Sequence, residues 1–531
     1  MEKKFDTELW KEDYEEFARV TAQFYKKEIS MKEYKGFSGG FGSYAQRGGE
    51  ASMLRLRLPG GELSLEKLKF IADSMKRYHI DKAHLTTCQT VQLHNLSETA
   101  VCGVAAEALN YGIVTRGGGG DFPRNVMVSP LSGVEEGEFF DVMPYAKKTS
   151  DYLMELIRGP KLPRKLKVGF SNSPKNMTHA TFRDLGFAAR EDGTFDVYSA
   201  GGLGNQPKLG VKVAEAADPL DILFYVRAMY ETFLAYGNYE NRGKARTRYM
   251  QESLGGSEQY KKAYLEKLDA VYRSGKNLRL NPDELLEQKA AVLEKGRLEE
   301  GTSLPDDLES MDGKRMIRQK QKHLYAVHYH PLGGDIAPEM FGKLYQLLKE
   351  MKGTGIRLAP DESMYVINCT AEEARKVLEL TSDSAKTDFE CSVACIGASI
   401  CQIGVRDSQA LLKKLVKMEQ EEGFGDGVLP AIHISGCPSS CGTHQIGTIG
   451  FHGGVKMINK VPHPAFTLHY NGREQEGAEQ FGETLGVILE EDIPDFLRQI
   501  GRRVQQSGEN FDAWLKRHPD GVKEIAGAFL R

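Results

Sequence analysis

Hydrophobic and polar positions follow one pattern twice along the chain. The stretch GGELSLEKLKFIADSMKRYHIDKAHLTTCQTVQL, from Gly60, aligns without a gap onto GGDIAPEMFGKLYQLLKEMKGTGIRLAPDESMYV, from Gly333. In each copy, apolar residues recur every three or four positions after a Gly-Gly turn, which predicts an amphipathic helix followed by a loop and a strand. These residues are Leu65, Leu68, Ile71, Ala72 and Met75 in the first copy, and Phe341, Leu344, Leu348 and Met351 in the second. The alternation in RLRLPGG and YAVHYHPLGG predicts a strand before each helix.

A second pattern is also repeated. KVGFSNSPKN, from Lys167, matches AIHISGCPSS, from Ala431, and the same offset places Gly186-Phe187 on Gly450-Phe451. Such internal repeats indicate the architecture of a chain. We therefore expect a duplicated two-module protein, in which Ser173 and Met177 stand where the second copy has Cys437 and Cys441.

Length and charge narrow the class of protein. A chain of 531 residues is too long for one ordinary core and predicts about three domains. Its 70 basic and 74 acidic residues are interspersed, which argues against a nucleic-acid binder. No stretch approaches the apolar length needed to span a bilayer, and the start MEKKFDTELW lacks an apolar core. We expect no membrane contact and a cytoplasmic location.

The cysteines are strongly clustered. Five of the eight fall within residues 391–441, in CSVACIGASIC and GCPSSCG, where an even distribution would place fewer than one. Their close pairs are spaced C-x3-C and C-x5-C, whereas zinc sites usually use C-x2-C or C-x4-C. An iron-sulfur cluster also takes four thiolates, and glycine-rich turns supply N–H groups to its sulfides. Zinc ligands and small buried thiols remain the alternatives at this point.

Cations and glycines suggest an anion site. Lys165 and Lys167 alternate, which places both ammonium groups on one face of a strand, where they bind a shared anion or face solvent. Glycine-rich stretches at 39–49, 116–120 and 201–205 let backbone N–H groups approach a large ligand, or form flexible loops. None is a dinucleotide fingerprint.

The ordered set MLRLRLPGG, QTVQLH, FPRNV, LPRKLK, GGLGN, C-x5-C and GCPSSCG resembles the siroheme-dependent sulfite and nitrite reductase family over nearly the whole chain. The family's pattern of C-x5-C followed by C-x3-C implies that a [4Fe-4S] cluster is bound by Cys395, Cys401, Cys437 and Cys441. It also implies that Cys441 is the axial ligand of the siroheme iron. Cys391 is then a bystander, and the remaining thiols, Cys88, Cys102 and Cys369, are expected to be packed.

The resemblance also implies which residues bind substrate and siroheme. The substrate-binding and catalytic cations are Arg55, Arg124, Lys165 and Lys167. The siroheme-binding residues are Gln89, Gln92, His94, Gly202, Gly204, Asn205, Arg242, Arg246 and Arg248. A second lysine at Lys167 is similar to the sulfite-reducing branch, so we expect six-electron reduction of sulfite to sulfide, with nitrite reduction to ammonia as the alternative.

The chain departs from the family at two positions. Where the family has R-x-T-x-R-Q-x-x-Q-x-H, this chain reads HLTTCQTVQLH, with His84 and Cys88 in place of arginines. Each lost charge-assisted hydrogen bond costs about 1.5 to 3 kcal/mol of cofactor binding if nothing replaces it. A siroheme-free iron-sulfur electron-transfer protein is therefore the alternative from another class, and a structural zinc protein is a third.

The electron donor is expected to be a separate protein, because the chain has neither a flavin nor a nicotinamide fingerprint. The resemblance implies ferredoxin, and a partner flavoprotein subunit is the alternative.

The repeats predict a duplicated α+β chain with pseudo-twofold symmetry, and the resemblance implies that its modules are ferredoxin-like half-domains and two mixed α/β siroheme-reductase domains. The expected parts are an N-terminal arm (1–47), paired half-domains (48–120 and 322–385), a first reductase domain (121–321) and a second one with the cysteines (386–531). Residues 281–315 are expected to form a helix and a linker.

Overall fold

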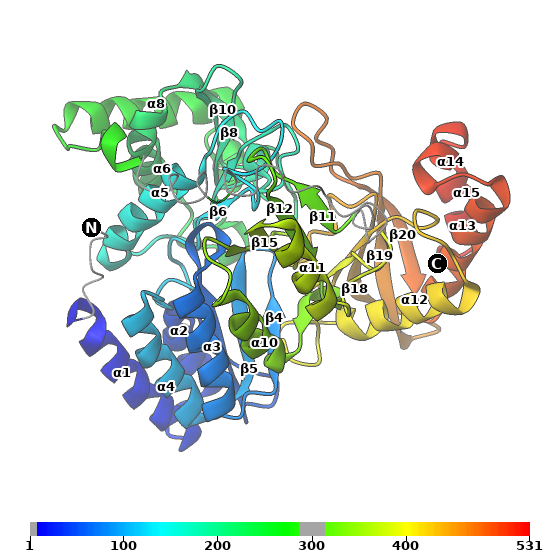
Figure 1. Cartoon of the computed structure of the whole chain (residues 1–531). Coiled ribbons are helices and arrows are strands. Elements are labelled where there is room, and N and C mark those ends of the chain that lie inside the picture. Colours follow the sequence, from blue (N-terminus) through cyan, green and yellow to red (C-terminus); the bar gives the residue numbers. More distant parts are fainter. Residues whose placement is uncertain (1–7, 286–294, 296–313) are drawn as a thin grey trace. The chain divides into compact units, whose positions relative to one another are not determined.

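The computed structural model describes residues 8–285, 295 and 314–531 (Figure 1). The chain forms two compact units. Unit 1 comprises Met1–Gly202, Lys208–Tyr329 and Ile336–Ser382, and unit 2 comprises Leu203–Pro207, His330–Asp335 and Asp383–Arg531. Most of the expected linker, 286–294 and 296–313, and the start of the expected arm, 1–7, lie outside the described residues.

The two copies of the first module form two five-stranded sheets with the same strand order. One is β1(Ser43–Ala45), β2(Ser52–Arg57), β5(Thr90–Leu96), β4(Lys82–Leu85) and β13(Asp335–Ile336). The other is β11(Met316–Arg318), β12(Tyr325–Tyr329), β15(Met364–Cys369), β14(Gly355–Leu358) and β3(Glu62–Leu63). Each sheet takes its fifth strand from the other copy, so the halves are interlocked.

The helices of the first module confirm the predicted repeat. They are α3(Leu65–Arg77) and α4(Glu98–Glu107) in the first copy, and α10(Pro338–Leu348) and α11(Ala371–Leu380) in the second. The apolar faces of α3 and α10 join one core, and the two helices pack on each other (Figure 1). Gly60 and Gly333, which correspond in the repeat, both have a left-handed backbone, with φ of 62° and 57°. Both copies therefore turn in the same way before their helix.

The described part of the N-terminal arm is helical. Helices α1(Glu8–Tyr25) and α2(Met31–Ser38) precede β1, and α1 packs on α4. Trp10, Tyr14 and Phe17 of α1 are buried in the core of the first module. Burial of these aromatic side chains fixes the helix to the sheet.

The second module also occurs twice with one topology. In unit 1 the sheet has the order β10(Val211–Ala217), β9(Phe195–Ser199), β8(Leu185–Ala189), β7(Val168–Ser171) and β6(Met127–Val128). In unit 2 the order is β16(Val393–Ala394), β17(Ile432–Ser435), β18(Ile449–Ile458), β19(Val461–Tyr470) and β20(Glu483–Leu489). In both sheets three strands pair in parallel and the others antiparallel.

Helices complete the two copies of the second module. Unit 1 has α5(Met143–Glu155), α6(Ile222–Tyr236), α7(Tyr249–Ser253) and α8(Ser257–Arg273). Unit 2 has α12(Ser408–Glu422), α13(Ile493–Ser507), α14(Phe511–Arg517) and α15(Gly521–Gly527). The expected α+β class and its duplication are confirmed, whereas the expected domain bounds stay a prediction. Among the residues that the structure describes, no helix has the length and apolar character to cross a membrane.

The correspondence between the second-module copies also holds in the backbone. A Cβ added at Gly186 would lie 1.8 Å from the carbonyl oxygen of Ala180, and one at Gly450 would lie 1.8 Å from that of His444. Both sheets thus carry a loop that crosses so closely over a strand that only glycine fits beneath it.

Candidate functional site

The four cysteines of the expected cluster lie on two loops of unit 2. Cys395 and Cys401 follow β16, and Cys437 and Cys441 follow β17. The loops are joined through their backbones: Cys395 N–H donates to Ile434 O at 3.1 Å. The N–H groups of Val405 and Arg406 both donate to Gly436 O at 2.9 Å. The fold of unit 2 therefore brings the C-x5-C and C-x3-C segments together.

The surroundings of Cys395 suit a thiolate ligand. The N–H of Gly436 donates to Cys395 Sγ at 3.1 Å, and Ser408 Oγ lies 3.2 Å from the same sulfur. Burial, with Cys441 adding to it, raises the pKa of the Cys395 thiol to about 12 when no metal is bound. Coordination to a metal removes the thiol proton. A Cβ at Gly442 would lie 2.1 Å from Ile434 O, so this turn also requires glycine.

The remaining cysteines differ in their surroundings. Burial raises the pKa of Cys369 to about 12 and that of Cys102 to about 11, as expected of packed thiols. Cys391 is half-buried. All eight cysteines are thiols rather than disulfides, and Cys441 is the most exposed of the four expected cluster ligands.

The GGLGN motif contributes to unit 2. Gly204 N–H donates to Gln445 Oε1 at 3.1 Å, and Gln445 Nε2 donates to Gly204 O at 2.7 Å. Asn205 follows Gly204 in the same segment of unit 2. Gly202 belongs to unit 1, where it exchanges two backbone hydrogen bonds with Lys208. Gln445, shortly after Cys441 in the chain, therefore joins this motif to the cysteine loop, a role that sequence reasoning missed.

Two of the expected substrate cations are held by one carbonyl group of unit 1. Arg55 Nη1 and Arg124 Nη1 donate to Gly118 O at 2.6 and 2.9 Å. Arg124 Nη2 also donates to Gly120 O at 2.7 Å. Burial, together with Arg55 and other neighbouring cations, lowers the pKa of Arg124 to about 10, which still leaves it charged at neutral pH. The glycine-rich stretch 116–120 thus positions both guanidinium groups.

Lys165 and Lys167 flank Leu166, which forms a bridge with Pro123 beside β7. Lys167 Nζ lies 3.1 Å from Cys88 Sγ. Burial alone would raise the pKa of Cys88, but Lys167 and Arg183 outweigh it and lower the pKa to about 6. Cys88 is therefore a half-buried thiolate at neutral pH, which differs from the inert packed thiol expected from the sequence.

Two further cations belong to this region of unit 1 and were missed. Arg57 is buried and donates to the carbonyl oxygens of Arg116 and Arg124 at 2.8 and 3.1 Å. Arg183 is buried, donates to Thr178 O at 2.6 Å and lies 3.1 Å from His179 Nδ1. The R-x-R spacing in LRLRLP is the signal that could have found Arg57, since alternate strand residues share a face.

The residues that replace the family's arginines have partners of their own. His84 Nε2 lies 3.6 Å from Glu362 Oε1, and both side chains are buried. His84 on β4 is opposite Gln92 on β5, and Gln92 is opposite Arg55 on β2. A buried histidine and carboxylate therefore stand one strand beyond Gln92 from Arg55, at a position where the family's pattern has an additional guanidinium group.

The remaining expected siroheme residues are positioned in different ways. Gln89 is buried, and its amide binds the backbone of Val128 and Leu358. His94 is buried on β5. Arg242 pairs with Asp121 at 2.8 Å, and Arg246 pairs with Asp184 at 3.1 Å. Arg248 lies over the Tyr249 ring, 4.7 Å from its centroid. The ligand roles of all these residues stay predictions.

The donor groups fit the expected cofactors. Unit 2 supplies four thiols on two joined loops, with a backbone N–H aimed at one sulfur. In unit 1, the buried Nε atoms of Arg124 and Arg246 have no hydrogen-bond partner among the described residues. Unsatisfied guanidinium N–H groups are suited to the carboxylates of a polyanionic ligand.

Comparison with known proteins points to nitrite and sulfite reductases. Residues 44–111 match the model of a nitrite/sulfite reductase ferredoxin-like half domain. Residues 119–270 match the model of a nitrite and sulphite reductase 4Fe-4S domain. The second match covers the first copy of the second module, whereas the expected cluster cysteines lie in the second copy.

Both nitrite reductases and sulfite reductases are similar to this chain. The chloroplastic ferredoxin–nitrite reductase of Zea mays is 28% identical over 76% of this chain and 69% of the relative. Sulfite reductase [ferredoxin] 1 of Mycolicibacterium paratuberculosis is 23% identical over 88% of this chain and 82% of the relative. The NirA protein of Mycobacterium tuberculosis superposes with a TM-score of 0.73 at 22% identity, covering 94% of this chain and 93% of that chain, which shows a shared fold.

Proposed function

Because the chain belongs to the nitrite and sulfite reductase family and is thus an oxidoreductase, we propose that it reduces sulfite to sulfide, with nitrite as the alternative substrate. The observation that carries this proposal is the set of cations in unit 1. Arg55 and Arg124 are fixed on one carbonyl oxygen, and Lys167 lies in the same basic region. An iron-sulfur electron carrier has no need of such a set, whereas an oxyanion substrate does.

The proposed cofactor ligands lie in unit 2. Cys395, Cys401, Cys437 and Cys441 would hold a [4Fe-4S] cluster, and Cys441 would also bind the siroheme iron. Together the two centres would pass electrons from the donor protein, one at a time, to a six-electron reduction. The protein orients Cys395 through the Gly436 N–H and Ser408, and it holds the cysteine loops together through Gly436 O.

The cations supply binding and protons. Arg55 and Arg124 would bind the substrate oxygens through their guanidinium N–H groups. Lys165 and Lys167 would neutralise the anion and donate protons to oxygens that leave as water. Burial lowers the pKa of Lys167, which makes its ammonium a better acid than an exposed lysine.

Nitrite remains the second candidate because of one specific contact. The thiolate of Cys88, 3.1 Å from Lys167 Nζ, offsets the charge of the second lysine. A pocket with one fewer net positive charge suits a singly charged anion better than a doubly charged one. The relatives include reductases of both substrates, in agreement with either outcome.

The donor is proposed to be ferredoxin, as the names of the relatives state for those proteins, and a partner flavoprotein subunit is the alternative. If the protein is instead a siroheme-free electron carrier, it should show the absorbance of the iron-sulfur cluster but not the absorption bands of an iron isobacteriochlorin. The visible spectrum of the protein purified without air from cells that make siroheme separates it from the reductase.

The substrate is tested by comparing two lysine variants of the siroheme-loaded enzyme. Lys167→Asn removes a cation proposed to bind substrate, and we expect kcat/KM for sulfite to fall roughly 10-fold or more, with a smaller change for nitrite. Lys161→Gln removes an exposed cation and should change neither value. An equal effect of Lys167→Asn on both substrates would contradict the preference for sulfite. Absence of both reactions in the loaded wild-type enzyme would overturn the reductase itself.

A further inference from the structure

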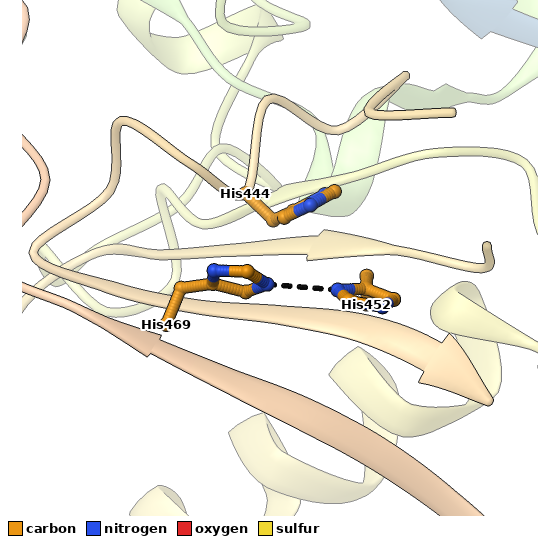
Figure 2. A group of neighbouring side chains, drawn as sticks. All are labelled: His444, His452 and His469. Carbon is orange, nitrogen blue, oxygen red and sulfur yellow. Dashed lines mark hydrogen bonds between the residues drawn. The ribbon is translucent and has the colours of Figure 1, made fainter. Parts of the chain in front are cut away.

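Three histidines of unit 2 gather on one face of its sheet (Figure 2). His452 lies on β18, His469 on β19, and His444 on the loop that precedes β18. Phe451 and Leu468, the neighbours of two of these residues, point to the opposite face and belong to the hydrophobic core. Because strand side chains alternate between faces, the three imidazoles occupy the face away from that core.

The strand register brings two of the histidines together. Gly450 is opposite His469, and His452 lies two positions beyond Gly450, so His452 and His469 are diagonal neighbours. Their Nδ1 and Nε2 atoms are 2.8 Å apart. His444 is held above them because Gly450 has no side chain to collide with its backbone. One candidate ligand nitrogen from each residue lies within 4.8 Å of the other two.

All three imidazoles favour the neutral form. Burial, together with the other histidines, lowers the pKa of His444 well below its usual range. Burial also lowers the pKa of His452 to about 4 and that of His469 below its usual value. Neutral imidazole is the form that coordinates a metal. The only hydrogen bond within the trio, among the described residues, joins His452 to His469.

We propose that His444, His452 and His469 form a binding site for a divalent transition-metal ion of the zinc class. Zinc lies about 2.0–2.1 Å from each histidine nitrogen, so a tetrahedral site holds its nitrogens about 3.4 Å apart. The trio reaches this geometry if the His452–His469 hydrogen bond opens slightly and His444 moves inward. The ring centroids, 4.8 to 5.0 Å apart, already converge. The fourth position is left for water or a small anion.

Hydroxyl groups orient two of the ligands. His444 Nδ1 lies 2.9 Å from Ser435 Oγ, which leaves Nε2 directed to the metal. His469 Nδ1 lies 3.4 Å from Thr484 Oγ1. Such partners of the second ring nitrogen are typical of metal-bound histidine. Ser435 Oγ also accepts the Gly442 N–H at 3.0 Å. The metal would therefore brace the turn that carries Cys441, without taking part in the proposed reduction.

The experiment uses the full-length holoenzyme with its cluster assembled, so that the cysteines are occupied. After dialysis against a weak chelator, the protein is titrated with Zn²⁺, and bound zinc and iron are counted by mass spectrometry. We expect one equivalent of zinc in the wild type and roughly 100-fold or more weaker binding in His452→Gln and His469→Gln. His463→Gln changes another histidine of β19 that lies outside the trio, and it should bind as the wild type does.

X-ray absorption at the zinc edge tests the wild-type protein itself, independently of whether the variants fold. A shell of nitrogen at about 2.0–2.1 Å with imidazole scattering is expected, whereas sulfur at about 2.3 Å would assign the metal to cysteines and overturn the proposal. Unchanged zinc binding in both histidine variants, or no binding by the wild type, would overturn it as well. None of these outcomes depends on reductase activity, so the site and the proposed function fail separately.

Discussion

The two copies of the second module share a backbone but differ in chemistry. The loop of the first copy lies between β7 and β8, and the loop of the second lies between β17 and β18. Asn176 and Ser440 both have a left-handed backbone, and so do His179 and Thr443. The loops therefore make the same turns at corresponding positions of the repeat, in agreement with an origin by duplication.

The side chains at equivalent positions are of different kinds. Cys437, Cys441 and His444 of the second copy replace Ser173, Met177 and Ala180 of the first, at the constant offset. In the opposite sense, the first copy has cations where the second has small residues: Lys167 corresponds to Ala431, and Arg183 to Gly447. One copy thus supplies soft ligands and the other supplies charge, and the shared backbone positions both.

The largest effect is expected when the same alanine substitution is made at equivalent positions of the two loops. Cys437→Ala removes a proposed thiolate ligand, so we expect loss of the cluster with its iron and acid-labile sulfide, and loss of all reductase activity. Ser173→Ala makes the same change at the equivalent position and should leave both contents at the wild-type level. Full iron content in Cys437→Ala would remove Cys437 from the ligand set.

A second pair of substitutions tests whether the backbones are as alike as they are described. Gly186→Ala and Gly450→Ala each place a Cβ 1.8 Å from a carbonyl oxygen, so the loop must move away from the strand. We expect each to lower the free energy of unfolding by about 3 kcal/mol, measured by urea denaturation. The control is Gly454→Ala on β18, where the nearest atom to the new Cβ is 4.0 Å away. If Gly450→Ala lowered the free energy of unfolding no more than this control does, the loop would not cross the strand as closely as described.

The repeats explain how much of the fold could be predicted from the sequence. Two constant offsets and the helix periodicity within them predicted the α3 and α10 helices and the duplicated sheets, because local hydrophobic patterning decides these elements. The exchange of β3 and β13 between the two first-module sheets was not predicted. It depends on pairing between strands that are far apart in the sequence, such as Glu62 with Arg357, for which the chain carries no local signal.

The site was predictable where its residues are close in sequence. The clustering of five cysteines between Cys391 and Cys441 pointed to the two loops that unit 2 joins, and the family resemblance selected the four proposed ligands among them. The contact between Cys88 and Lys167 joins two modules, and that between His84 and Glu362 joins two copies of one module, so neither could be found from local motifs. Five of the chain's 13 histidines fall between His433 and His469, which is a visible signal. Which of them converge depends on the register of β18 and β19, and this the sequence alone does not determine.

The smallest expected effect is a change in the pKa of Cys88, in the cation-rich region of unit 1. Burial raises the pKa of Cys88, whereas Lys167, Arg183 and Arg55 lower it, with a net value of about 6. Lys167→Met removes the largest of these lowering influences, so we expect the pKa of Cys88 to rise by one unit or more. Each unit corresponds to about 1.4 kcal/mol of lost preference for the thiolate. Alkylation of Cys88 by iodoacetamide, followed by mass spectrometry of its peptide from pH 4.5 to 10, reports the midpoint.

The alkylation rate of Cys88 should rise with pH because the thiolate is the form that reacts. In the wild type, alkylation should be fast above about pH 6 and slow below it, because the protonated thiol is a poor nucleophile. In Lys167→Met the same rise in rate should come at higher pH, and a pKa raised by one unit lowers the rate at pH 7 roughly 2-fold, while Lys161→Met keeps the wild-type midpoint. An unchanged midpoint in Lys167→Met would mean that Arg183 and Arg55 hold the thiolate without the lysine. The electrostatic coupling between Cys88 and Lys167 would then be weaker than their 3.1 Å contact implies.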